Sequence, residues 1–218
     1  MPIQHVIFDL DGTLTDSRLG ITRCWAHALT ALGRVAPPLH ELERYIGPPT
    51  REVAAELFAT GDAGLIERAV ASYRERFATV GLLENKVYPG VDALLTELAA
   101  RGLEQWICTS KPRVYAERIA EHFGFTRAVR GVYGPELDGT PGGKDQLLAL
   151  LLQRERIVPS SAVMIGDRRH DAEAAHGNGT RCIGVLYGYG SRAELQAAGA
   201  EQLCVSVTEL SAAVVALA

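Results

Sequence analysis

The chain has 218 residues, with 22 basic and 26 acidic side chains and a formal net charge of -4. Its pI near 5.9 leaves no positive field that would attract nucleic acid or an anionic membrane. No apolar run approaches the roughly 18 residues of a membrane span, and the N-terminus lacks the basic and apolar segments of a signal peptide. The four dispersed cysteines indicate buried thiols in a reducing compartment. We therefore expect a cytoplasmic monomer or homodimer whose partners are small molecules rather than nucleic acid or membrane.

The first predicted element is a buried strand over residues 4–10, and it contains the start of the segment Asp9-Leu10-Asp11-Gly12-Thr13. Residues i and i+2 of a strand lie on the same face, so Asp9 and Asp11 would point into one small volume. Two like charges held that close need a bound cation or a shared proton. Because Asp-Gly also marks turns, a tight loop with two solvated acids is the alternative.

The next predicted elements are helical. The spacing of apolar residues predicts amphipathic helices over residues 17–32 and 65–77, a short segment over 39–46, and a helix over 52–58 that Thr50 would cap. No convincing strand lies between residues 17 and 85, and a Tyr-Pro-Gly turn at residues 88–90 ends this block. We therefore expect a helical subdomain over residues 17–86.

Beyond this block, helices and strands alternate. The predicted helices cover residues 91–100, 112–123, 144–153 and 171–176, and the predicted strands cover residues 105–109, 128–132, 162–165 and 182–186. Ser191 and Glu194 form the pattern of a capping box before a late helix, and residues 203–207 are expected to form a final edge strand. Such alternation predicts parallel strands joined by right-handed crossovers. The expected fold class is α/β, with a doubly wound, Rossmann-like parallel sheet over residues 1–16 and 87–218, interrupted by the inserted helical cap.

Reactive side chains follow several of these predicted strands, at the sheet edge where α/β proteins bind ligands. Thr109 and Ser110 end one strand, while Asp167 ends another, with Asp171 one helical turn later. Lys144 opens an apolar helix, where a cation opposes the helix dipole. Taken singly, helix caps or an exposed lysine would explain these residues. Four converging carboxylates with a lysine favour Mg²⁺, which takes a few carboxylates and keeps positions for water and phosphate oxygens.

Together these segments resemble a known pattern. Asp9-Leu10-Asp11-Gly12-Thr13, Thr109, Lys144, and Gly166-Asp167 with Asp171 are similar, in order, to the four motifs of the haloacid dehalogenase superfamily of phosphotransferases. The helical block resembles the superfamily's C1-type cap between the first and second motifs. Further likeness to the phosphoglycolate phosphatase group lies in Thr109-Ser110-Lys111-Pro112, Gly47-Pro48-Pro49 and Tyr187-Gly188-Tyr189, although many relatives carry asparagine in place of Ser110.

The resemblance implies an aspartyl-phosphate mechanism. Asp9 would be the nucleophile and Asp11 the general acid and then the general base. Lys144 and Mg²⁺ would neutralise the charge that separates an anionic nucleophile from an anionic ester. The resemblance also implies that the phosphoryl group binds Leu10 and Asp11 through their backbone amides, Thr109, Ser110 and Lys144, and that Mg²⁺ binds Asp9, Asp11 through its backbone carbonyl, Asp167 and Asp171.

The implied function is Mg²⁺-dependent hydrolysis of small phosphate esters, with 2-phosphoglycolate first and nucleoside monophosphates, the substrates of a 5'-nucleotidase, second. Asp11 argues against dehalogenation, because a departing halide needs no proton. Arg51, beside the Pro-Pro turn, is the candidate for gripping a substrate carboxylate, with an exposed helix arginine as the alternative. A mutase resembling β-phosphoglucomutase would share every core residue. A catalytically silent phosphometabolite sensor is the alternative from another class.

Overall fold

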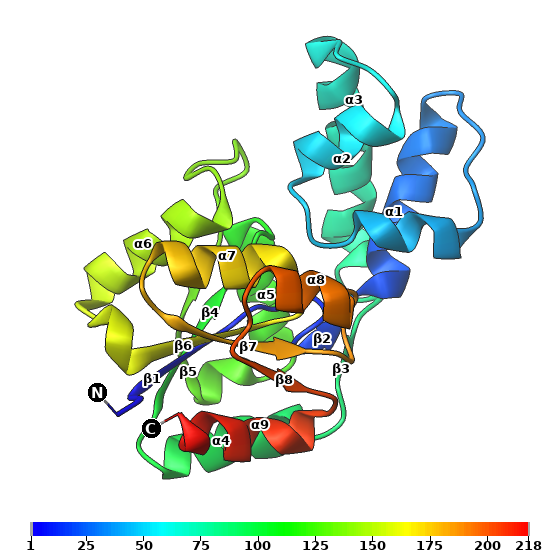
Figure 1. Cartoon of the computed structure of the whole chain (residues 1–218). Coiled ribbons are helices and arrows are strands. Elements are labelled where there is room, and N and C mark those ends of the chain that lie inside the picture. The colour runs from blue at the N-terminus through cyan, green and yellow to red at the C-terminus, as the bar shows by residue number, and fades with distance from the viewer. Residues whose placement is uncertain (1, 218) are drawn as a thin grey trace. The chain divides into compact units, whose positions relative to one another are not determined.

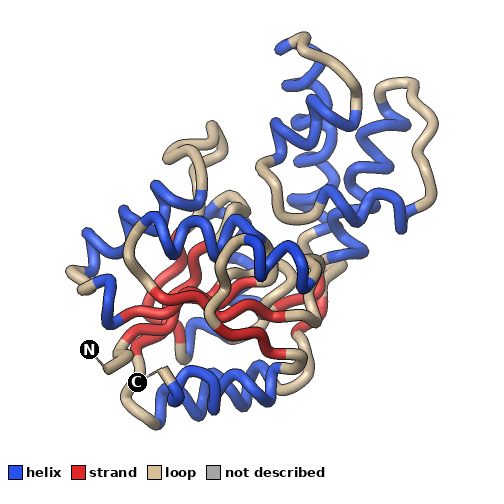
Figure 2. Tube along the Cα trace, viewed as in Figure 1, coloured by secondary structure: helices blue, strands red, loops and turns tan. Residues whose placement is uncertain are grey.

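A computed structural model of the protein describes residues 2–217. Its larger unit, Met1–Thr15 and Val87–Ala218, contains a six-stranded sheet with the strand order β5-β4-β1-β6-β7-β8. The strands of this sheet are red in Figure 2. Neighbouring strands pair in parallel throughout this sheet. The strands are β1 (His5–Phe8), β4 (Glu104–Cys108), β5 (Val129–Tyr133), β6 (Ala162–Gly166), β7 (Arg181–Val185) and β8 (Gln202–Cys204). The predicted α/β fold class is confirmed.

The centre of the sheet is β1, which lies between β4 and β6. Its residues Val6, Ile7 and Phe8 are all buried, as expected for a parallel strand covered on both faces. From β1 the chain proceeds outward through β4 and β5, and it then crosses back to build β6, β7 and β8 on the other side. This reversal creates a topological switch point beside the C-terminal end of β1, which is where α/β sheets bind ligands.

Helices cover both faces of the sheet. In Figure 1, α6, α7 and α8 lie on one face, and α4 and α9 lie on the other. Short 3-10 helices occupy Phe125–Arg127 and Pro159–Ser161. The helices of this unit are α4 (Val91–Ala100), α5 (Arg113–His122), α6 (Lys144–Glu155), α7 (Arg169–Gly177), α8 (Arg192–Ala197) and α9 (Val207–Ala216).

One core cluster joins the sheet to α6 and α7. Ile7, Trp106 and Met164 extend from three adjacent strands and pack with Leu148 of α6 and Ala175 of α7. Burial of each large apolar side chain contributes on the order of 1.5–3 kcal/mol. The cluster therefore fixes α6 and α7 relative to β1 and β6. As a result, the first residues of both helices are also held in place relative to the sheet.

The second unit, Asp16–Lys86, is helical and has its own core. Trp25 packs on Tyr73 with ring centroids 4.4 Å apart, and Tyr73 stacks on Phe77 at 5.5 Å. The short strands β2 (Thr15–Asp16) and β3 (Lys86–Val87), where the chain leaves and re-enters the larger unit, form a two-stranded sheet. The helices of this unit are α1 (Arg18–Ala31), α2 (Thr50–Leu57) and α3 (Ala63–Arg76), with a 3-10 helix over Leu39–Tyr45 and a π-helical turn over Phe77–Gly81.

The start of α2 differs from the sequence prediction. Thr50 is the first helical residue and Pro49 occupies the cap position, so the predicted capping role of Thr50 is wrong. The extended conformation of Pro49, with ψ of 139°, explains the difference, because the chain enters the helix directly after it. Among residues 2–217, no helix combines the length and apolar character needed to cross a bilayer.

Candidate active site

The end of β1 places Asp9 at the centre of the sheet edge. The Asp9 backbone N–H donates to the carbonyl of Ile165 on β6 at 2.8 Å. The chain then turns sharply, with Gly12 at φ 84°, a left-handed conformation that glycine adopts with the least strain. Asp9 and Asp11 are both buried, so the alternative of a loop with two solvated acids is wrong.

Three buried carboxylates converge at this edge. One oxygen from each of Asp9, Asp167 and Asp171 lies within 4.8 Å of the others. Burial raises the pKa of Asp9 to about 6 despite the nearby Lys144. Burial also raises the pKa of Asp167, and the Asp9 and Asp171 carboxylates raise it further. Three carboxylates thus lie together with only one lysine to offset their charge, and such an excess of carboxylates is typical of cation-binding sites.

Lys144 is the counter-charge of this cluster. It is the first residue of α6, follows Gly143 at φ 83°, and is buried. Its Nζ lies 2.7 Å from Asp9 Oδ1 and donates to Asp171 Oδ1. Burial alone would lower the pKa of Lys144, but the Asp171 and Asp9 carboxylates outweigh burial and raise it. The pairing accounts for a cation at a helix start, and the alternative of an exposed lysine is wrong.

Asp171 is held by two partners. Helix α7 begins at Arg169, two residues before the predicted start, because the Asp171 carboxylate accepts from the Arg168 backbone N–H and the Asp171 backbone N–H donates to the Arg168 carbonyl. Asp171 Oδ2 accepts from the Arg168 backbone N–H at 3.0 Å, while Oδ1 accepts from Lys144. Both oxygens of Asp171 are thus engaged, and this residue orients Lys144 toward Asp9.

Asp167 has the opposite character, because one of its oxygens lacks a partner. Asp167 Oδ2 accepts from the Tyr189 backbone N–H at 2.6 Å. Within residues 2–217, Asp167 Oδ1 is buried and has no hydrogen-bond partner. A buried carboxylate oxygen without a donor is costly, and a divalent cation would satisfy it. The residues present therefore fit a metal ion.

Glycines make room for Asp167. A Cβ atom built on Gly12, Gly188 or Gly190 would overlap Asp167 atoms. Two of these glycines belong to the loop after β7, whose Tyr187 hydroxyl donates to the Thr13 carbonyl at 3.0 Å. The Tyr187-Gly188-Tyr189 segment, which the sequence associated only with a subgroup, thus closes over the metal-ligand candidate.

Asp11 pairs with a residue that the sequence analysis did not place in the site. Lys111, buried on the loop after β4, positions its Nζ 2.8 Å from Asp11 Oδ1 and 2.7 Å from Oδ2. The Asp11 side chain is thereby drawn to Lys111, while Asp9 contacts Lys144. The chain has only three lysines, so their scarcity is a signal that could have identified Lys111.

The predicted phosphate contacts occupy the same edge. Thr109 is buried, and its hydroxyl oxygen accepts from the Lys111 backbone N–H at 3.3 Å. Ser110 is half-buried on the same loop. The carbonyl of Leu10 accepts from the backbone N–H groups of Leu14 and Thr15 at 3.0 and 2.9 Å, which folds the loop after β1 back on itself. Backbone amides in such a turn form a concavity suited to an anion.

Arg51 lies in the other unit, on α2. Its Nε is 2.6 Å from Glu67 Oε1 and its Nη2 is 3.3 Å from Glu67 Oε2, so the guanidinium is bidentate to a carboxylate of α3. Both side chains are exposed. The predicted contact of Arg51 with a substrate carboxylate would require exchange of Glu67 for the ligand.

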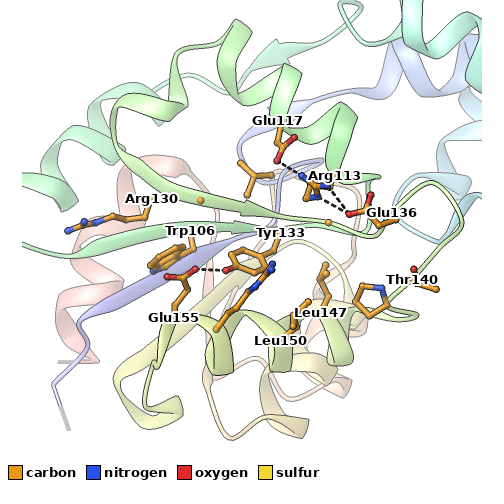
Figure 3. A pocket seen from close by; sticks show the side chains of 15 residues that line it. Trp106, Arg113, Glu117, Arg130, Tyr133, Glu136, Thr140, Leu147, Leu150 and Glu155 are labelled. Carbon is orange, nitrogen blue, oxygen red and sulfur yellow. Dashed lines mark hydrogen bonds and ion pairs between the residues drawn. The ribbon is translucent and has the colours of Figure 1, made fainter.

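A separate cavity of about 740 Å³ lies along β5, between α5 and α6 (Figure 3). On one side Arg113 contacts Glu117 and Glu136 at 2.9 Å, and on the other the Tyr133 hydroxyl donates to Glu155. None of the described residues that line this cavity belongs to the acid cluster. The candidate active site therefore lies at the ends of the strands and not in this cavity.

The fold and the acid cluster define a class of hydrolase. A model of the haloacid dehalogenase-like hydrolase family matches residues 6–185, and the chain belongs to this family. With its phosphatase-named relatives, this membership makes the protein a phosphoric monoester hydrolase and confirms the predicted resemblance.

Its relatives carry different names. A 5'-nucleotidase of Pseudomonas aeruginosa is 45% identical over 94% of this chain and 93% of the relative. Tyrosine-protein kinase PtkA of Mycobacterium tuberculosis is 37% identical over 86% of this chain but only 63% of the relative. A phosphoglycolate phosphatase of Pseudomonas putida is 31% identical over 84% of this chain and 70% of the relative. The crystal structure of a predicted phosphatase from Clostridium acetobutylicum, 36% identical, matches with a TM-score of 0.95 and covers 99% of this chain and 100% of that one.

Proposed function

We propose that the protein is a Mg²⁺-dependent phosphatase that hydrolyses small phosphate esters through an aspartyl-phosphate on Asp9. The observation that carries the proposal is the buried triad of Asp9, Asp167 and Lys144, in which Asp167 keeps one oxygen without a donor among the described residues. Asp9, Asp167 and the backbone carbonyl of Asp11 would hold the metal ion. Asp171, whose oxygens are already engaged, would reach it through water. Bound Mg²⁺ would supply positive charge against the phosphoryl oxygens.

The residues of the chain divide the reaction into two displacements. An oxygen of Asp9 attacks phosphorus, and the bond to the leaving oxygen breaks as Asp11 gives that oxygen a proton. Asp11 then takes a proton from water, whose oxygen displaces Asp9 and releases inorganic phosphate. Lys144 holds the attacking carboxylate and offsets its charge. Thr109, Ser110 and the backbone amides of Leu10 and Asp11 bind the transferred group.

Nucleoside 5'-monophosphates are the preferred substrate class. The sequence alone ranked 2-phosphoglycolate first, but the 45% identity to a 5'-nucleotidase exceeds the 31% identity to a phosphoglycolate phosphatase and supports the opposite order. Residues 17–86 would act as the cap that sets this choice, and residues 1–16 and 87–218 would form the catalytic core. A cytoplasmic location is supported by Cys24, Cys108, Cys182 and Cys204, which are all buried and free.

Phosphate release tests this proposal. Purified protein is assayed against nucleoside monophosphates, 2-phosphoglycolate, a glucose phosphate and an aryl phosphate, each with Mg²⁺ and with EDTA. We expect Mg²⁺-dependent release, with the highest kcat/KM on a nucleoside monophosphate. Release without Mg²⁺ would contradict the metal assignment, and isomerisation of the glucose phosphate without release of phosphate would favour the mutase. Absence of turnover on every ester, with binding retained, would favour the silent sensor.

A further inference from the structure

The distribution of lysine in this chain is unusual. Only three lysines occur among its 22 basic residues, and the others are arginines. Lys86 is exposed, whereas Lys111 and Lys144 are both buried at the acid cluster. An ammonium group is a compact point charge, while a guanidinium is a broad planar fork. The chain therefore uses lysine at its two buried cation positions and arginine almost everywhere else.

Lys111 is fixed at both its side chain and its backbone. Its Nζ spans the two oxygens of Asp11, at 2.8 and 2.7 Å, and only 5% of the lysine side chain is exposed. Its backbone N–H donates to the Thr109 hydroxyl oxygen at 3.3 Å. Its carbonyl lies against Gly134, where a Cβ atom would overlap it. The loop after β4 thus presents the ammonium group at a defined point.

The two buried lysines serve different acids. Lys144 contacts Asp9 and Asp171, while Lys111 contacts Asp11. Without Lys111, the Asp11 carboxylate would be free to rotate within the turn after β1. The buried lysine that remains at the acid cluster, Lys144, already contacts Asp9. Two separate pairs keep each carboxylate in its own place, which is what different chemical roles require.

We propose that Lys111 is the positioning residue for Asp11. The inference rests on the proposed phosphatase function and deepens it. Lys111 holds the Asp11 carboxyl where it can give a proton to the leaving oxygen as the phosphorus–oxygen bond breaks. In the second displacement it holds Asp11 where it takes a proton from the attacking water. Lys111 itself neither bonds to phosphorus nor loses a proton in either step.

The leaving group provides the test. An alkyl phosphate needs a proton on its leaving oxygen, whereas a nitrophenyl phosphate hardly does. For Lys111→Met, we expect kcat/KM, which reports the first displacement and not the shared second one, to fall by about 100-fold on the alkyl ester, the lower end of general acid catalysis, with KM within about 3-fold of the native value. The loss on the aryl ester should be clearly smaller. Lys86→Met, which removes the exposed lysine, should change neither. Equal losses on both esters, or a change confined to KM, would overturn the positioning role.

A double variant separates this role from folding. Lys111→Met leaves Asp11 buried without its partner, whereas Asp11→Asn combined with Lys111→Met removes both charges and is expected to regain the native unfolding midpoint. If Lys111 acts only through Asp11, the double variant should be as active on the alkyl ester as Asp11→Asn alone. Additive losses would show an independent role and contradict the inference. Native protein without Mg²⁺-dependent phosphate release would instead contradict the proposed function itself.

Discussion

Each of the two units contains a cluster of ion pairs, and the two clusters differ in which charge is shared and in how deeply it is buried. In the larger unit, Asp9 and Asp171 share the ammonium group of Lys144, with every participating side chain at most 9% exposed. In the helical unit, Arg76 and Arg23 share the carboxylate of Glu84, closer to the surface. Burial raises the pKa of Asp9 to about 6. The pKa of Glu84 is instead lowered, chiefly by its hydrogen bonds from Arg76.

The difference is one of donor supply. Glu84 accepts from two guanidinium groups, so its negative charge is compensated within the protein. The acid cluster has fewer donors than buried carboxylate oxygens, and Asp167 Oδ1 has none among residues 2–217. A group of buried charges that needs an added cation is typical of a catalytic site, whereas a group whose charges are compensated within the protein stabilises the fold. The following substitutions test that distinction, beginning with the largest expected effect.

Asp9→Asn should abolish turnover without harming the fold. The amide keeps the shape of the side chain but cannot attack phosphorus, and it removes a carboxylate whose charge is disfavoured by burial. We expect phosphate release to fall to background while the Tm stays at or above the native value. Asp92→Asn, at an exposed position on α4, is the control and should keep full activity. Substantial activity in Asp9→Asn would remove it as the nucleophile.

Lys144→Met should lose both activity and stability. It leaves Asp9 and Asp171 facing each other without their shared cation, and breaking a buried ion pair typically costs about 3–5 kcal/mol. Urea unfolding measures the stability, and phosphate release measures the activity. Adding Asp171→Asn to Lys144→Met removes one of the stranded charges and should recover part of the stability but none of the activity. An unchanged unfolding midpoint in Lys144→Met would show that the cluster is not held by charge.

Strand ends were predictable from the sequence, whereas the partners of the acids were not. Periodicity and the Asp-x-Asp segment placed Asp9 at the end of β1, because alternation and strand direction are local properties. The Lys111–Asp11 pair depends on a loop one hundred residues further along the chain. The start of α7 depended on the hydrogen bond from the Arg168 backbone N–H to the Asp171 carboxylate, and arginine at a cap position is not a recognised signal. Contacts between loops of different strands require the sheet order, which a single sequence does not give.

The late helix shows the same limit. Ser191 caps α8 by accepting from the Glu194 backbone N–H at 3.1 Å, as the capping-box pattern predicted. The Glu194 carboxylate, however, accepts from the Arg168 side chain and the Arg169 backbone N–H. The pattern identified the helix start, but a tertiary contact determines the direction of the glutamate side chain.

Glu84→Gln should destabilise the helical unit without touching the chemistry. Loss of a partly buried, charge-assisted network is expected to cost about 1–3 kcal/mol. Since the pKa of Glu84 is lowered in the folded state, its contribution is fully present above the ordinary value of 4.5 and is lost as the pH falls through the lowered value. Unfolding midpoints at pH 7 and at decreasing pH should therefore converge for native protein and variant. A gap that persists at low pH would assign the effect to packing.

Arg51→Ala should have the smallest effect on stability, and it tests directly whether the protein selects carboxylated substrates. The Arg51–Glu67 pair is exposed on both sides, so its loss should leave the Tm nearly unchanged. If Arg51 exchanges Glu67 for a substrate carboxylate, KM should rise for 2-phosphoglycolate and stay constant for an aryl phosphate. Glu67→Gln is the matched variant, because it frees the guanidinium and should lower KM for the carboxylated ester alone. Parallel changes for both esters would mean that the pair only joins α2 to α3, and specificity would then have to come from other residues of the helical unit.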